Sequence, residues 1–197
     1  MKTVFIDVDS QLDFVYPAGA LYVSGAERIV PAISALNRFA AARGITVIST
    51  ADAHAENDSE FANWPPHCVV GTWGQRKPEA TLLDRRVVIP NREGPIDVAP
   101  QIVLEKQTVD AFHVPKLSRV IEALAPDAFV VYGVVTEVCV LHAVRGLLKL
   151  GRPVTIVTDA IKELSEAGAR DALGEVSASG AKLITSGALL SSPEEAH

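Results

Sequence analysis

The sequence predicts a doubly wound α/β fold, a three-layer sandwich in which helices cover both faces of a mainly parallel sheet of about six strands. Short runs rich in Val and Ile alternate with segments whose apolar residues recur at helical spacing along the 197 residues. The strand-like runs are apolar throughout, as expected where helices cover both faces of a sheet. Because no linker, internal repeat or low-complexity stretch interrupts this alternation, we expect a single domain that spans residues 1–197.

In the first half of the chain, the residues indicate two strands and one long helix. Residues 4–8 and 45–50 are short β-branched runs, and apolar residues at helical spacing predict a helix over about 26–42. Residues 51–100 are rich in Pro, Asn, Asp and Gly, with one possible short strand at 87–89. A segment of this length without regular structure inside a compact domain is usually functional.

The second half of the chain returns to a regular alternation of strands and helices. Each helical segment is followed by a short apolar run, as in successive strand–helix–strand units. The predicted strands are 102–105, 128–134, 154–157 and 182–184, and the predicted helices are about 116–123, 138–149 and 165–178.

Charge and composition exclude several classes of partner. The net charge is −6 and no run of basic residues occurs, so neither nucleic acid nor an anionic membrane is expected as a partner. The longest apolar run, 128–135, is too short to cross a bilayer, and aspartates at 7, 9 and 13 interrupt any signal-peptide pattern. Two cysteines without an export signal indicate reduced thiols and a cytoplasmic protein. We expect a small-molecule substrate and a homo-oligomer.

Polar residues follow the strands at the edge where ligands bind in such sheets. Ligands of doubly wound proteins sit beyond the carboxyl ends of the strands, so the residues at those ends are candidates for function. In chain order these are Asp9, Asp52 with His54, Lys106, residues 136–139, and Asp159.

Cys139 is the candidate nucleophile, because it lies where an apolar strand passes into a helix. The partial positive charge at a helix start favours the thiolate, and free N–H groups there can receive an oxyanion. The alternative is a small buried core residue. Cys68 is the rival thiol, but it follows two prolines and a histidine in a loop, and we expect it to be a packed residue.

A thiolate that attacks a carbonyl needs a proton acceptor and donor nearby. Asp9 could transfer the proton and Lys106 could adjust the charges of the acids around it, since each ends a predicted strand. The alternative for each is a solvated charge at a strand end. Glu105 and Asp13 compete for the same roles, although Glu105 points away from Lys106 on a regular strand.

The 51–100 segment contains residues that could ligate a metal. Asp52 and His54 point the same way on an extended chain, and a long loop can bring Glu60 and His67 back to them. Two imidazoles with carboxylates suit Zn²⁺ first, with Fe²⁺ and Mn²⁺ as alternatives. Asp58 is a possible substitute for Glu60. Spacing alone also fits histidines that are merely solvated.

Several motifs together resemble one family over essentially the whole chain. The sequence resembles the nicotinamidase/pyrazinamidase branch of the isochorismatase-like cysteine hydrolases. Lys106 matches the family lysine. The motifs are Asp9-Ser10-Gln11-Leu12-Asp13-Phe14, Asp52-Ala53-His54, Trp64-Pro65-Pro66-His67-Cys68, and Gly133-Val134-Val135-Thr136-Glu137-Val138-Cys139-Val140. The Trp-Pro-x-His-Cys element is the most specific of these for nicotinamidases.

The resemblance implies an isochorismatase-like fold and a reaction. Cys139 would attack the carboxamide of nicotinamide and form a thioester, while Asp9 passes the proton to departing ammonia. It also implies a cis peptide bond between Val134 and Val135, with the N–H groups of Val135 and Cys139 as oxyanion donors. A metal, zinc first, held by Asp52, His54, Glu60 and His67 would bind the pyridine nitrogen, and Phe14 and Trp64 would sandwich the ring.

Two departures from the family pattern leave other functions open. Glu60 stands where many relatives have a third histidine, and the chain after Lys106 lacks the expected tyrosine-containing stretch. Phe112 and His113 are therefore expected in the pocket wall, where they could select another amide, and Trp73 could narrow the pocket. The alternatives are a hydrolase of another small carboxamide, ureide or carbamoyl compound, a metal hydrolase in which Cys139 is structural, and a non-enzymatic small-molecule binder.

Overall fold

The computed structural model describes residues 1–191 and contains one sheet of seven strands that all run parallel. The strand order is β3-β4-β2-β1-β5-β6-β7, so the chain starts in the middle, builds outward to one edge and then returns to build the other. This is the predicted doubly wound arrangement, and the possible strand near 87–89 is the seventh. The strands are β1 (Thr3–Val8), β2 (Thr46–Asp52), β3 (Arg86–Ile89), β4 (Gln101–Lys106), β5 (Ala128–Val134), β6 (Val154–Lys162) and β7 (Lys182–Ile184).

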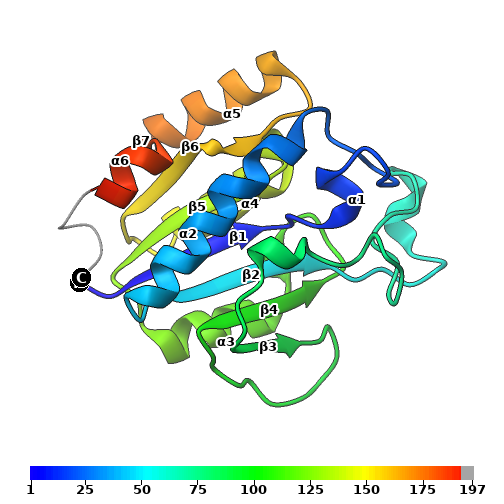
Figure 1. Ribbon diagram of the computed structural model, residues 1–197, viewed down its shortest axis with the longest axis horizontal. Coiled ribbons are helices and arrows are strands. Elements are labelled where there is room, and N and C mark those ends of the chain that lie inside the picture. The colour runs from blue at the N-terminus through cyan, green and yellow to red at the C-terminus, as the bar shows by residue number, and fades with distance from the viewer. Residues whose placement is uncertain (192–197) are drawn as a thin grey trace.

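Helices cover both faces of the sheet. Parallel crossovers are right-handed, so helices that follow steps in opposite directions along the sheet lie on opposite faces. The long helix before β2, α2 (Val30–Ala42), crosses the front of the sheet in Figure 1. The helices that follow β4, β5 and β6 cover the other face. The helices are α1 (Leu12–Val15), α2 (Val30–Ala42), α3 (Pro115–Leu124), α4 (Leu141–Leu148), α5 (Glu166–Ala178) and α6 (Ser186–Ser191). None of the helices in residues 1–191 has the length and apolarity that a membrane span requires.

Local residue chemistry explains where the main helices begin and end. Pro31 and Pro115 stand in the first turns of α2 and α3, where a missing N–H costs nothing. Gly44, at φ +68°, follows the end of α2 and allows the turn into β2. Ser165 caps α5 by accepting a hydrogen bond from the Gly168 N–H at 3.1 Å.

The structure departs from the sequence expectations at three places. Residues 26–29 form a 3-10 turn, so the helix expected over 26–42 begins at Val30. Thr136–Val140 forms a single π-helical turn ahead of α4. β6 continues to Lys162, so Asp159 lies inside a strand rather than at its end. Asp159 is exposed and accepts hydrogen bonds from the N–H and hydroxyl of Ser186 at the start of α6, at 2.6 and 2.7 Å, so it does not join the other strand-end residues.

Candidate active site

Cys139 lies in the turn that joins β5 to α4, close to the middle of the sheet. β5 ends with a cis peptide bond between Val134 and Val135, which the resemblance implied. Gly133 has φ +120°, and a Cβ at this position would lie 2.0 Å from the carbonyl oxygen of Val8. Only glycine therefore allows the end of β5 to approach β1 closely enough to bring the cysteine turn beside Asp9.

Asp9 is held in an unusual backbone conformation directly after β1. It is fully buried and has φ +45°, in the left-handed region that a non-glycine residue rarely adopts. The hydroxyl of Thr50 accepts a hydrogen bond from the Asp9 N–H at 3.2 Å and donates one to Asp9 Oδ1 at 2.7 Å. β2 thus fixes both the backbone and the carboxylate of Asp9.

Lys106 joins the two strand-end carboxylates. Its Nζ lies 2.9 Å from Asp9 Oδ2 and 2.5 Å from Asp52 Oδ1, and it donates a hydrogen bond to the Thr108 carbonyl at 3.0 Å. The side chain is 1% exposed, so one buried ammonium lies between two buried carboxylates. Burial alone would lower the pKa of Lys106, but Asp52 and Asp9 raise this pKa well above its ordinary value. Lys106 is therefore a permanent cation in the folded protein.

The acid groups around Lys106 differ in their affinity for protons. Burial raises the pKa of Asp9, and Lys106 and Thr50 oppose this increase. Burial also opposes ionisation of Asp52, but Lys106 and His67 outweigh it and lower the pKa of Asp52 to about 2. Burial raises the pKa of the Cys139 thiol, and a hydrogen bond to Asp9 acts in the same direction while Lys106 opposes it. Burial and Asp9 therefore oppose formation of the Cys139 thiolate, and Lys106 favours it.

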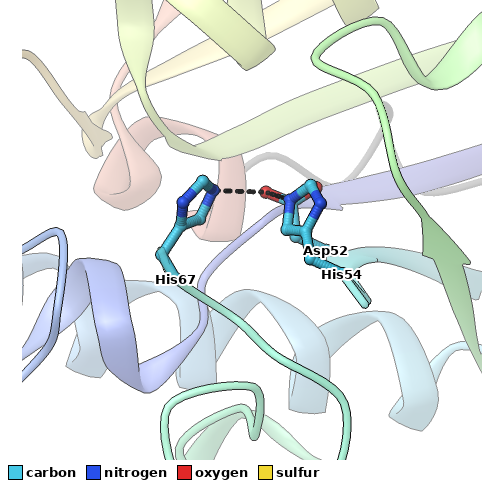
Figure 2. A group of neighbouring side chains, drawn as sticks. All are labelled: Asp52, His54 and His67. Carbon is cyan, nitrogen blue, oxygen red and sulfur yellow. Dashed lines mark ion pairs between the residues drawn. The ribbon is translucent and has the colours of Figure 1, made fainter. Parts of the chain in front are cut away.

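Three of the predicted metal ligands meet at one point. The ligand atoms of Asp52, His54 and His67 all lie within 4.8 Å of one another, and all three residues are buried. Asp52 Oδ2 is 3.9 Å from His54 Nε2 and 3.8 Å from His67 Nε2, and Figure 2 shows both imidazoles turned toward this carboxylate. Among the described residues His54 Nε2 has no hydrogen-bond partner. A buried nitrogen without a partner, beside a carboxylate and a second imidazole, fits a divalent metal with nitrogen and oxygen ligands such as zinc.

Neighbouring acceptors orient both imidazoles. Asp58 Oδ2 is 3.0 Å from His54 Nδ1, and the Pro65 carbonyl is 2.7 Å from His67 Nδ1. Each contact favours a proton on Nδ1 and leaves Nε2 free to face the metal position. Asp58 thus contacts His54 on the ring nitrogen that faces away from Asp52.

A mainly apolar cavity opens above Cys139. It measures about 380 Å³ including its open mouth. Asp52 and His67 lie in its wall, and so does Glu60, whose pKa burial and the Asp52 charge raise. The remaining lining residues are Phe14, Leu21, Val23, Trp64, Val109, Val135, Val138 and Leu164.

Three residues expected at the pocket do not line this cavity. His113 is exposed, Phe112 packs against Gly146 of α4, where a Cβ would lie 2.1 Å from the Phe112 ring, and Trp73 is 49% exposed. Val109 lines the cavity in their place. No signal in the sequence distinguished Val109, or Leu164 after β6, from ordinary loop residues.

The rival candidates from the sequence are engaged elsewhere. Asp13 accepts hydrogen bonds from the Ala20 and Cys68 N–H groups at 2.8 and 2.7 Å, and Glu105 accepts one from Gln75 at 3.3 Å. Burial raises the pKa of the Cys68 thiol, as expected for a packed residue. One further contributor lies in the motif that begins at Asp9: Gln11 bonds to both the N–H and the carbonyl of Asp52, at 2.7 and 2.8 Å, and so fixes the end of β2.

Fold and site together define a doubly wound α/β protein with a thiol, a carboxylate and a lysine close together at the carboxyl ends of its central strands. The isochorismatase domain model matches residues 3–188, and the chain belongs to this family of hydrolases, in which its named relatives are amidohydrolases.

Three comparisons illustrate the relationship. The chain is 27% identical over 200 residues to the nicotinamidase of Escherichia coli, with 90% of this chain and 92% of the relative covered. It is 26% identical over 156 residues to an N-carbamoylsarcosine amidase of an Arthrobacter species, with 78% and 57% covered. The pyrazinamidase of Pyrococcus horikoshii, solved in complex with zinc, superposes with a TM-score of 0.79 at 26% identity, covering 94% of this chain and 99% of that one.

Proposed function

We propose that this protein hydrolyses nicotinamide to nicotinate and ammonia through a thioester on Cys139. One observation carries the proposal: a single cavity is lined by Cys139, by Asp52 and His67 of the candidate metal site, and by the aromatic rings of Phe14 and Trp64. Nicotinamide is a flat pyridine ring that carries a carboxamide group at a carbon apart from its ring nitrogen. Such a molecule can reach the thiol and the candidate metal position at once, and likeness to nicotinamidases supports this choice.

The acid groups suit an acyl-transfer reaction. Asp9 accepts the proton as the Cys139 sulfur attacks the carboxamide carbon, and then donates it to the amide nitrogen as the carbon–nitrogen bond breaks and ammonia leaves. In the second half Asp9 takes a proton from water, which attacks the thioester, and the proton returns to the sulfur as nicotinate leaves. Lys106 keeps a positive charge beside Asp9 in both halves, and the N–H groups of Val135 and Cys139 would stabilise the oxyanion.

A metal held by Asp52, His54 and His67 would supply a Lewis acid that binds the pyridine nitrogen and so orients the ring. We propose Glu60 as a further ligand, because it lies in the same cavity wall as Asp52 and His67. Elemental analysis of Glu60→Ala after equilibration with zinc tests this, and we expect a lower zinc content than in the wild type. An unchanged zinc content assigns the remaining positions to other ligands.

Ammonia release from nicotinamide is the decisive measurement. We expect release by the wild type, loss of release in Cys139→Ala, and retention of most activity in the matched control Cys68→Ala, which removes the other thiol. Metal removal should abolish release, and added zinc should restore it. Full activity in Cys139→Ala overturns the thiol mechanism.

The substrate is tested separately from the chemistry. The likeness to an N-carbamoylsarcosine amidase favours carbamoyl and ureido compounds as the second candidate class. A panel with nicotinamide, pyrazinamide and N-carbamoyl amino acids separates the two classes. Cleavage of carbamoyl compounds alone, still dependent on Cys139, retains the mechanism and replaces the substrate.

A further inference from the structure

A second buried ion pair lies on the opposite side of β1 from the catalytic lysine. Lys77 Nζ is 3.2 Å from Asp7 Oδ2 and donates a hydrogen bond to Ser10 Oγ at 3.0 Å. Ser10 Oγ donates to Asp7 Oδ1 at 2.6 Å, and Ser49 Oγ donates to Asp7 Oδ2 at 2.9 Å. Asp7 and Ser10 are fully buried and Lys77 is 6% exposed. We call these four residues the Lys77 network.

One hydrogen bond of the Lys77 network closes a turn that contains Asp9. The bond from Ser10 to Asp7 closes a turn across Val8 and Asp9, and Asp9 is the residue at φ +45°. A non-glycine residue in this region costs about 1–2 kcal/mol and persists where the surrounding contacts determine it. The bonds between Asp9 and Thr50 act on this residue directly. The contacts of Ser10 on one side and of Gln11 with Asp52 on the other hold the backbone that follows Asp9.

Lys77 is also the last residue of a segment, residues 74–77, that is hydrogen-bonded to the residues directly after Asp9. The carbonyls of Gly74, Gln75 and Arg76 accept hydrogen bonds from the Asp13 N–H at 3.0 Å, the Gln11 amide at 2.8 Å and the Leu12 N–H at 2.7 Å. The Lys77 ammonium reaches Ser10. Residues 74–77 therefore hold residues 10–13 along their full length. A Cβ at Gly74 would lie 2.1 Å from the Asp13 carboxylate, which shows how close the two segments are.

We propose that Lys77 is a positioning residue for the proton-transferring carboxylate, acting through Ser10 and Asp7 on the backbone of Asp9. This inference rests on the role of Asp9 in the proposed function. Buried ion pairs often contribute little net stability compared with apolar residues of similar size. We therefore explain the Lys77 network by the backbone conformation that it imposes on Asp9, rather than by a contribution to net stability. Loss of the network lets Asp9 relax toward ordinary backbone angles and moves its carboxylate away from the Cys139 thiol.

The variants are chosen so that a simple loss of folding does not decide the result. Asp7→Asn with Lys77→Met removes both charges together and leaves no buried charge without a partner. Ser10→Ala removes only the hydroxyl that links Lys77 to the turn. Arg76→Met is the matched control, because it removes a neighbouring positive charge whose side chain is exposed and keeps the backbone carbonyl that holds Leu12. Urea unfolding and zinc content establish that each variant is folded and binds metal as the wild type does.

Two readouts separate positioning from a purely structural role. For nicotinamide we expect kcat to fall on the order of tenfold to hundredfold in the double variant and about tenfold in Ser10→Ala, with KM within about threefold of wild type. The second readout is the rate of alkylation of Cys139 by iodoacetamide at one fixed pH, followed by peptide mass. Because the contact with Asp9 raises the pKa of the Cys139 thiol, its loss leaves more thiolate, and we expect alkylation to be faster in both variants. Arg76→Met should match the wild type in both.

Each result decides the inference. Folded variants that alkylate at the wild-type rate overturn it, whatever happens to turnover, and so does a change in KM with kcat unaltered. If the wild type does not hydrolyse nicotinamide, the proposed function fails, while the alkylation rates still test the role of Lys77 because they need no substrate. Faster alkylation together with wild-type unfolding and zinc content supports the positioning role, and slower alkylation contradicts it.

Discussion

Removal of the Lys106 charge gives the sharpest test of the electrostatics at the site. Lys106 Nζ lies 2.9 Å from Asp9 and 2.5 Å from Asp52, and Lys106→Met keeps most of the apolar stem while it removes the cation. The variant then buries two carboxylates without the ammonium that joins them. Burial and the charge of Asp52 already raise the pKa of Asp9, and Lys106 opposes this increase. We therefore expect Asp9 to take up a proton when the variant folds.

The expected loss of stability follows from two limits that agree. Breaking a buried ion pair typically costs about 3–5 kcal/mol. Protonation of a carboxyl whose ordinary pKa is near 4 costs about 4 kcal/mol at pH 7. Proton uptake by Asp9 therefore limits the loss of stability to about this value. We expect the free energy of unfolding at pH 7 to fall by about 3–4 kcal/mol. Because the folded variant holds a proton that the unfolded chain releases, its stability falls further as pH rises, by up to about 1.4 kcal/mol per pH unit.

Urea unfolding of the metal-free proteins between about pH 5 and pH 8 measures both effects. Lys162→Met is the matched control, because Lys162 pairs with Glu163 at the surface and its loss should cost less than about 1 kcal/mol. Ammonia release should fall by a factor of about 10²–10⁴, since a protonated Asp9 cannot accept the thiol proton. A variant with the wild-type urea midpoint at pH 7 and no added pH dependence would refute this account of the charges.

Three further predictions address the metal support, a buried phenol and the nucleophile turn. Asp58→Asn should weaken zinc affinity by about 10–100-fold in competition with a chelator, because His54 loses the carboxylate that orients it; equal affinity would show that Asp58 does not act through His54. Burial raises the pKa of Tyr132 well above its ordinary value, so the folded state keeps a proton that the unfolded chain loses near pH ~10, and stability should fall as pH rises beyond that point. Tyr132→Phe should be less stable near neutral pH by about 1–3 kcal/mol, because Asn37 Oδ1 loses the hydroxyl that donates to it at 2.5 Å. Because the variant lacks the titrating hydroxyl, its stability should fall less steeply in alkali than that of the wild type. Gly133→Ala should fail to give soluble folded protein, because the new Cβ meets the Val8 carbonyl; a folded variant with normal circular dichroism would show that β5 can move away from β1.

Much of the fold and of the site centre could be predicted because their signals are local. Apolar runs marked the strands, and the carboxyl ends of parallel strands share one edge, so the sequence alone places Asp9, Asp52 and Lys106 together. Lys106 and Asp52 are in fact direct partners in the β2–β4 register. His54 follows from the same strand, and His67 is brought beside it by the parallel bridge between His54 and Val69.

The walls of the cavity could not be predicted in the same way. Phe112 and His113 were expected at the pocket because they follow Lys106 in the sequence, but a 3-10 turn at Ala111–His113 directs Phe112 onto α4. Its N–H bonds to Asp110 Oδ1 at 2.9 Å, which fixes that turn. Val109 and Leu164 reach the cavity from loops that follow different strands. Which loop residue faces a cavity depends on turn geometry that is set by tertiary contacts, and residue type alone carries little of that information.

The two aspartates at the end of β1 show the limit of periodicity most clearly. Residues two apart on a strand point to the same face, so Asp7 and Asp9 would be expected side by side. Their partners show otherwise, because Asp7 bonds to Ser49 and Asp9 bonds to Thr50, and successive residues of β2 face opposite sides of the sheet. The left-handed conformation of Asp9 accounts for this reversal. One face then receives the carboxylate of Asp7, paired with Lys77, and the other the carboxylate of Asp9, paired with Lys106. Two like charges that regular geometry would bring together are separated by the sheet, and each is paired with a different lysine.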